Sequence, residues 1–219
     1  MPEGIITALE IQKRNKERVN VYIDGEFAFG LSLIEAAKLR KGQQLSAQEI
    51  ALLREDDGVQ QAVDRAARFL AHRPRSVQEV RRNLKEKDVP PAVIDAALSR
   101  LETMGYVDDR TFARFWVQNR SEFKPLSARA LRFELHQKGV ANGIIDEILN
   151  DFDKDDAAFR AANSQVRRLR GKTRQEFRDK LFGFLQRRGF AYDTARTVIE
   201  RITEALETEE PNYFDEGEM

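Results

Sequence analysis

A segment of about fifty residues recurs three times after residue 60, and this repeat limits the possible folds more than any other feature. It occurs as VRRNLKEKDV ending at Val89, as LRFELHQKGV ending at Val140 and as LFGFLQRRGF ending at Phe190. The aligned apolar residues, at offsets of 51 and 50, are Val80, Leu131 and Leu181; Leu84, Leu135 and Leu185; Ile94, Ile145 and Ala195; and Leu98, Leu149 and Ile199. The first two sets lie four residues apart, which places them on one helix face. The pattern indicates tandem copies of one helical unit.

Start and stop signals divide each unit into three helices. Gly139 and Gly189 stand where a left-handed C-cap ends the middle helix, and Asp88 takes that place in the first copy. Caps before the middle helices are Ser76 with Glu79, Ser127, and Thr173 with Glu176. The leading helices are expected at roughly 60–72, 109–121 and 155–170, and the third helix of the first unit at roughly 91–103. The predicted fold is mainly α, with three tandem three-helix bundles in an elongated chain.

Only the first part of the chain carries patterns that predict β structure. Residues 5–11, 19–23 and 27–31 carry strand-like apolar patterns, and Asp24-Gly25 between the last two suits a type I′ turn. Two short helical segments follow at roughly 32–40 and 46–55, the second capped by Ser46 with Glu49. We expect a small module of three antiparallel strands whose apolar face these helices cover.

The stretch GYVDDRTFA, residues 105–113, joins the first unit to the second. Gly105 ends a helix, and Tyr106 and Val107 are expected to pack at the seam. Asp108 or Asp109 caps the next helix while the other acid sits near its positive end. Adjacent carboxylates at a helix start point in different directions, and no histidine or third carboxylate is close in sequence. We therefore interpret the two aspartates as structural residues without an acid–base role. The stretch as a whole is interpreted as a hinge that fixes the angle between two units.

Composition favours small helical units in solution. Charged residues make up 34% of the chain and hydrophobic residues 41%, and no stretch of about 18 uncharged apolar residues occurs. The N-terminus lacks the pattern of a signal peptide, and the chain has no cysteine. These features predict a soluble cytoplasmic protein without a disulfide framework or a thiolate metal site.

The net charge of zero conceals a strong gradient. Residues 157–206 hold 12 Lys/Arg and 5 Asp/Glu, whereas residues 207–219 hold no basic residue and 6 acidic ones. A basic segment beside an acidic tail suggests a polyanionic partner or an acidic protein surface. The tail is expected to be mobile. One hypothesis is that it shields the basic third unit until a partner binds.

Four stretches make the chain resemble a known family. They are GYVDDRTFA at 105–113, RPRSVQEVRRNL at 73–84, ELHQKGV at 134–140 and KLFGFLQRRGF at 180–190. With the threefold repeat, they are similar to the RecX regulators of the RecA recombinase over roughly residues 58–206, and the N-terminal module looks like the extension of longer members. The resemblance implies a non-enzymatic, monomeric regulator in recombination, DNA repair and the SOS response. It would bind RecA filaments on DNA and inhibit their recombinase and ATPase activities.

The expected domains follow from the repeat and the resemblance. They are an N-terminal β module at 1–58, three-helix repeats at 59–107, 108–153 and 154–206, and an acidic tail at 207–219.

Basic residues on the middle helices form the candidate partner-binding set. Arginine outnumbers lysine there, and its planar guanidinium suits bidentate contact with carboxylate or phosphate. About half of such side chains are expected to be solvated without a partner. The candidates are Arg81, Arg82, Arg129, Arg132, Lys172, Arg174, Arg178, Arg187 and Arg188.

The sequence offers no catalytic, metal or cofactor motif. Neither His72 nor His136 belongs to a metal-ligand or triad spacing, and no GxxxxGK[ST] or GxGxxG occurs. A hydrolase or nuclease would need clustered carboxylates or histidines. Two interpretations remain open: a filament regulator, and a direct DNA-binding module built from helical trios that resemble helix-turn-helix units.

Overall fold

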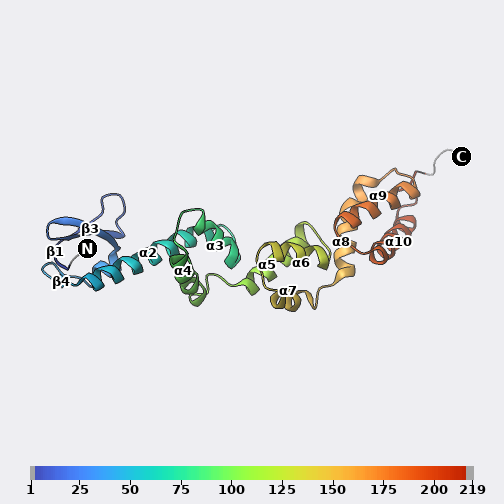
Figure 1. Ribbon diagram of the computed structural model, residues 1–219. Helices are drawn as coiled ribbons and strands as arrows, with labels where there is room; N and C mark the ends of the chain where they lie inside the picture. The colour runs from blue at the N-terminus through green and yellow to red at the C-terminus, as the bar shows by residue number, and fades with distance from the viewer. Residues whose placement is uncertain (1–2, 216–219) are drawn as a thin grey trace. The chain divides into compact units, whose positions relative to one another are not determined.

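The computed structural model describes residues 3–215 and divides the chain into two compact units. Unit 1 contains residues up to Arg75 together with Glu79–Val107, and unit 2 contains Ser76–Gln78 together with the chain from Asp108 onward. Mainly helical structure with a small N-terminal sheet confirms the predicted fold class (Figure 1).

An antiparallel sheet opens unit 1. Asp24 and Gly25 both have positive φ, at 52° and 87°, as a type I′ turn requires, and they close the predicted hairpin. A two-residue strand that the sequence did not indicate pairs with the first strand and makes the sheet four-stranded, in the order β3-β2-β1-β4. A strand of two residues is too short for its sequence to show the alternation of apolar and polar side chains that indicates a strand. The strands are β1 (Gly4–Ile11), β2 (Arg18–Ile23), β3 (Glu26–Ser32) and β4 (Gln44–Leu45).

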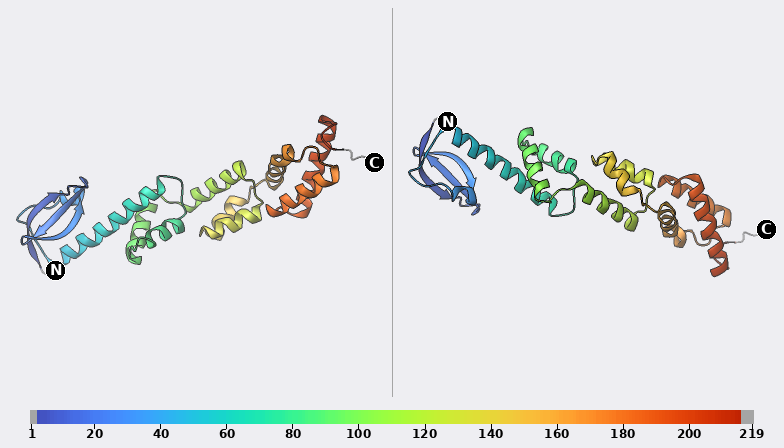
Figure 2. Two further views of the ribbon diagram at one scale, coloured as in Figure 1. Left: turned by 90° about the horizontal axis from the view of Figure 1, so that it is seen from above. Right: turned by 90° about the horizontal axis from the view of Figure 1, so that it is seen from below.

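The apolar face of the sheet packs against α1 (Leu33–Ala36) and the start of α2 (Ala47–Leu70). Ile6, Val21 and Leu31 are fully buried there. The capping box of Ser46 and Glu49 begins α2 as predicted. However, the two helical segments expected at 46–55 and 60–72 are one helix, which Figure 2 shows running from the sheet into the next helices of unit 1. A single glycine inside a helix costs only about 1 kcal/mol, so Gly58 does not break it.

A buried ion pair fastens the sheet to α2. Both terminal nitrogens of the Arg18 guanidinium donate to the carboxylate of Asp57, at 3.0 and 2.8 Å, and Gln61 donates to the same carboxylate at 2.7 Å. Asp57 is only 6% exposed. Because its carboxylate accepts three bonds, burying this charge is compatible with a stable helix.

The three repeats each bury an apolar stripe, as the alignment predicted. Val80 and Leu84 of the first repeat, like the aligned leucines of the other two, are almost completely buried. Repeat 1 consists of the second half of α2, α3 (Val77–Lys85) and α4 (Pro91–Thr103). Repeat 2 consists of α5 (Asp109–Phe123), α6 (Ala128–Gln137) and α7 (Asn142–Leu149). Repeat 3 consists of α8 (Lys154–Val166), the 3-10 turn η1 (Arg167–Leu169), α9 (Arg174–Arg187) and α10 (Tyr192–Glu209).

The middle helices end as the sequence indicated. Asp88, Gly139 and Gly189 all adopt positive φ, at 57°, 81° and 84°. Within unit 2, the end of α9 also forms a joint with the start of α6: the Ser127 amide donates to the Arg188 carbonyl at 3.1 Å. A Cβ at Gly189 would lie 2.6 Å from the Ser127 hydroxyl, so this joint needs glycine for space as well as for conformation.

The acidic tail is packed as far as the structure describes it, so the expectation of a mobile tail is wrong for residues 207–215. The helix α10 continues to Glu209, and Tyr213 is 2% exposed. The Tyr213 hydroxyl donates to the Val166 carbonyl, and its ring meets that of Phe177 edge-on at 5.7 Å. The remainder of the expected tail, residues 216–219, lies outside the described residues.

Candidate partner-binding surface

Equivalent ion pairs hold two of the candidate arginines in repeats 1 and 2. Arg81 on α3 pairs with Asp95 on α4, and Arg132 on α6 pairs with Asp146 on α7 at 2.6 Å. Both pairs join the middle helix to the third helix of their own bundle. The arginine side chains are about 40% exposed, so each pair contributes less than about 1 kcal/mol. These guanidinium groups are therefore already paired with a carboxylate of their own bundle in the absence of a binding partner.

Repeat 3 replaces this pair with a different contact. The aligned positions are Phe182 and Arg196, and the Phe182 ring meets Tyr192 edge-on with centroids 5.1 Å apart. Arg196 instead donates to Glu200 at 2.9 Å, and this bond, helped by the charge of Arg178, lowers the pKa of the Glu200 carboxyl. Phe182 thus packs against the start of α10.

Two further candidates on α9 are also paired with acids of α10. Arg174 contacts Glu207 at 2.5 Å and Arg178 contacts Glu200 at 3.7 Å. Together with Arg81 and Arg132, they form a paired set of four basic residues. Each of the four holds its middle helix to the third helix of the same bundle.

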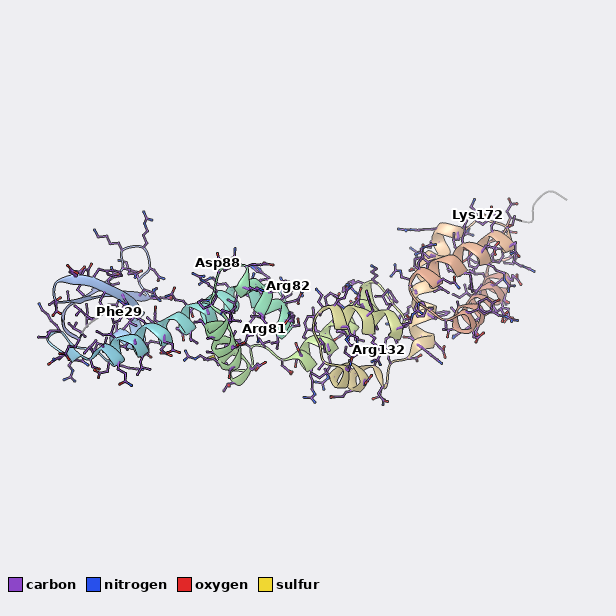
Figure 3. The ribbon with its side chains drawn as sticks, viewed as in Figure 1. Phe29, Arg81, Arg82, Asp88, Arg132 and Lys172 are labelled. Atoms are coloured by element: carbon purple, nitrogen blue, oxygen red, sulfur yellow. The ribbon has the colours of Figure 1, made fainter. Side chains whose placement is uncertain are left out.

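Four other candidates form no ion pair with any residue between 3 and 215, and we call them the free set. Figure 3 labels Arg82 on α3 and Lys172 just before α9, together with the paired Arg81 and Arg132. Arg82, Arg129 and Arg187 are exposed, and Lys172 is half-buried. Their charges are the ones left for a carboxylate or phosphate of another molecule. The free set is Arg82, Arg129, Lys172 and Arg187.

Arg188 belongs to the joint between α6 and α9. Its guanidinium donates to the Pro125 carbonyl at 3.3 Å and lies over the Phe184 ring, 4.8 Å from the centroid. Burial lowers the pKa of this group. Cation–π stacking and a carbonyl bond are typical of a guanidinium that supports structure. The structure thus separates Arg188 from its exposed neighbour Arg187.

In GYVDDRTFA, Asp108 is the aspartate that caps the next helix. Asp108 caps α5 by accepting from the amides of Arg110 and Thr111, at 2.9 and 3.3 Å. A bond from the Thr111 hydroxyl, with those amides, lowers the pKa of the Asp108 carboxyl. Asp109 accepts from the Val77 amide at 2.9 Å. Among the described residues, no group of three potential ligands could hold a metal ion.

The other half of the same motif corrects one expectation. Gly105 has a φ of 72°, and the Tyr106 amide donates to the Leu101 carbonyl at 2.9 Å, which ends α4 as predicted. However, the Tyr106 side chain is 64% exposed, and Val107 is the buried residue at 3%. Of the two residues expected to pack, Val107 does so and Tyr106 does not, because the turn directs the Val107 side chain inward.

Lys154 is a basic residue that the sequence reasoning missed. It lies at the first position of α8 and lines a cavity together with Arg129. A lysine there is unfavourable for the helix dipole, which prefers acids at an N-terminus. A lysine between Asp153 and Asp155 at a helix start was therefore the sequence signal that could have identified it.

Four family models match the chain in order. They describe the N-terminal domain of regulatory protein RecX at residues 4–46, and the first, second and third RecX three-helix domains at 62–101, 108–149 and 153–199. A regulatory protein RecX of Lactobacillus johnsonii is 31% identical over 96% of this chain and 79% of its own length. A regulatory protein RecX of Bacillus cytotoxicus is 32% identical over 92% of this chain and 78% of its own length.

The chain belongs to the RecX family. A crystal structure of a regulatory protein RecX has the same fold, with a TM-score of 0.71 and 26% identity over 90% of this chain and 99% of that one. The structure of RecX from Lactobacillus salivarius is 18% identical with a TM-score of 0.58, and so supports the fold alone. The names of these relatives support a regulatory role for this RecX chain. None of its described helices is both long and apolar enough to cross a bilayer.

Proposed function

We propose that the chain binds RecA filaments on DNA and inhibits their recombinase and ATPase activities, without catalysing a reaction itself. The observation that carries this proposal is the match of four RecX domains in order between residues 4 and 199. Tandem repeats suit a polymeric partner because weak contacts to successive subunits add by multivalency. The same proposal makes the protein a cytoplasmic monomer.

The free set is the proposed contact surface. Arg82, Arg129 and Arg187 come one from each repeat, on or beside the middle helix, and Lys172 adds to the third. Carboxylates of an acidic protein surface, or phosphates, are the groups that such side chains bind. Inhibition would follow if the bound repeats block access to DNA or hinder subunit exchange along the filament.

The decisive measurement is RecA ATPase activity and strand exchange on single-stranded DNA, with and without the purified chain. We expect both activities to fall at stoichiometric amounts. Unchanged activities at those amounts would refute the assignment. The chain alone should show no ATPase or nuclease turnover with or without divalent metal.

Direct DNA binding is the second candidate, and the unpaired charges of the free set favour it. The two interpretations differ in their dependence on salt. Binding through phosphates weakens steeply as salt rises, with a slope of about −0.9 for each phosphate contacted on duplex DNA. Tight DNA binding without RecA, together with such a slope, would favour this second candidate.

A further inference from the structure

A cavity of about 480 Å³ opens between repeats 2 and 3, inside unit 2. The starts of α6, α8 and α10 and the end of α9 supply its walls. Its lining includes Ser127, Arg129, Lys154, Gln186, Gly189 and Thr194. The cavity is therefore built by two repeats, and neither repeat could form it alone.

The charged residues that line this cavity are all basic. Arg129 and Lys154 line it, no aspartate or glutamate does, and neither cation forms an ion pair with a residue between 3 and 215. The neighbouring cavity between α9 and α10 differs, because Asp179 and Glu200 accompany Arg178 and Arg196 there. In a chain with 37 basic and 37 acidic residues, two unpaired cations without a lining carboxylate mark a place suited to an anion.

Hydrogen-bond donors accompany the two cations. Gln186 and Thr194 line the cavity, and so does Ala191, the N-cap of α10, which forms no side-chain cap hydrogen bond. The first amides of a helix have no partner within it, so those at the start of α10 are available to a ligand. The two cations supply the positive charge, and the uncapped helix start adds N–H donors for the oxygens of an oxyanion.

The joint between α6 and α9 holds the walls in place before a ligand binds. The Ser127 amide donates to the Arg188 carbonyl at 3.1 Å, and Gly189 allows close approach to Ser127 and Ala130. A site whose walls are already fixed loses less entropy on binding.

We propose that this cavity binds a phosphate group, with Arg129 and Lys154 as its charged contacts and Gln186 and Thr194 as neutral donors. A tetrahedral oxyanion offers several acceptor oxygens to donors that converge from different helices. The group could belong to a nucleic-acid backbone or to a small phosphate compound. The proposal goes beyond the proposed function, because it holds whether or not RecA is the partner.

Amide chemical shifts of the full chain, without RecA, test the proposal. Inorganic phosphate and then pyrophosphate are titrated at constant ionic strength maintained with chloride. We expect saturable shifts at the amides of Ala128, Arg129 and Thr194. The double variant Arg129→Gln, Lys154→Gln should weaken the apparent Kd at least about tenfold, because it removes both charge-assisted contacts. The matched control Lys124→Gln, Lys180→Gln removes two exposed charges of unit 2 outside the cavity and should change Kd less than about twofold.

A third titration uses a single-stranded oligonucleotide. Shifts at the same amides that pyrophosphate reverses identify the DNA backbone as the source, whereas shifts with pyrophosphate alone identify a small phosphate compound. Shifts that do not saturate, or that persist unchanged in the Arg129 and Lys154 double variant, overturn the proposal. Because RecA is absent from every sample, failure here is distinct from failure of the filament assay.

Discussion

At the scale of single residues, three glycines of unit 2 separate the cost of backbone conformation from the cost of close contact. Gly143 lies in α7, without positive φ and with open space around its Cβ position. Gly171 has a φ of 73° and equally open space. Gly189 has a φ of 84°, and a Cβ there would lie 3.2 Å from the Ala130 Cβ and closer still to Ser127. The same substitution by alanine should therefore have three different outcomes.

We predict that Gly143→Ala stabilises unit 2 by up to about 1 kcal/mol, because alanine suits a helix better than glycine. Gly171→Ala should cost about 1–2 kcal/mol for the left-handed conformation alone. Gly189→Ala should cost about 3 kcal/mol, because overpacking adds to that strain. Denaturation in urea followed by Trp116 fluorescence measures all three, since the sole tryptophan lies in unit 2. Equal costs at Gly171 and Gly189 would contradict the joint between α6 and α9.

At the scale of elements, the segment after α10 completes the core of repeat 3. The amide of Gly171 donates to the Tyr213 carbonyl at 3.0 Å, and that of Asp215 donates to the Lys172 carbonyl at 3.1 Å. Phe214 meets Phe177 edge-on at 5.3 Å. Two acids near this end, Glu207 and Glu210, pair with Arg174 and Arg170. The hypothesis that the tail shields basic residues stays a prediction, but deleting residues 207–219 would also remove Tyr213 from the core.

We predict that Tyr213→Ala lowers the free energy of unfolding of unit 2 by about 3 kcal/mol, as expected for loss of a large buried aromatic side chain. Tyr213→Phe should cost about 1 kcal/mol, because only the bond to the Val166 carbonyl is lost. The control is Tyr192→Ala, whose side chain is 59% exposed, and its cost should stay below about 1 kcal/mol. Urea denaturation again provides the measurement. A cost for Tyr213→Ala no larger than that of the control would show that the segment is not anchored.

The elements that the sequence predicted correctly carry a local signal, and those it missed depend on distant contacts. The capping boxes at Ser46 and Thr173 and the Asp24-Gly25 turn are all present, because neighbouring residues decide them. The burial of Tyr213 depends on a pocket formed more than 30 residues earlier, around Phe177. The pairing of Arg174 with Glu207, and the lack of a pair at Lys172, likewise depend on which side chains tertiary packing brings near. Composition could identify the basic candidates, but it could not separate the paired set from the free set.

At the scale of the whole molecule, that separation predicts which charges serve a partner. The free set (Arg82, Arg129, Lys172, Arg187) and the paired set (Arg81, Arg132, Arg174, Arg178) each contain four positive charges. Changing either set to glutamine therefore alters the net charge equally, and long-range attraction to a polyanionic filament falls by a similar amount in both. A difference in binding between the two variants then reports direct contact. Comparing the two variants thus controls for the general weakening of binding that follows any loss of basic charge.

We predict that the free-set variant loses at least about tenfold more affinity for RecA filaments on single-stranded DNA than the paired-set variant. The paired guanidiniums already contact Asp95, Asp146, Glu200 and Glu207, and a partner must compete with those carboxylates. Each free side chain can instead form a new charge-assisted bond. Filament binding by fluorescence anisotropy at two salt concentrations provides the measurement, with thermal unfolding to confirm that both variants fold. Equal losses at both salt concentrations would show that overall charge, and not the free set, determines binding.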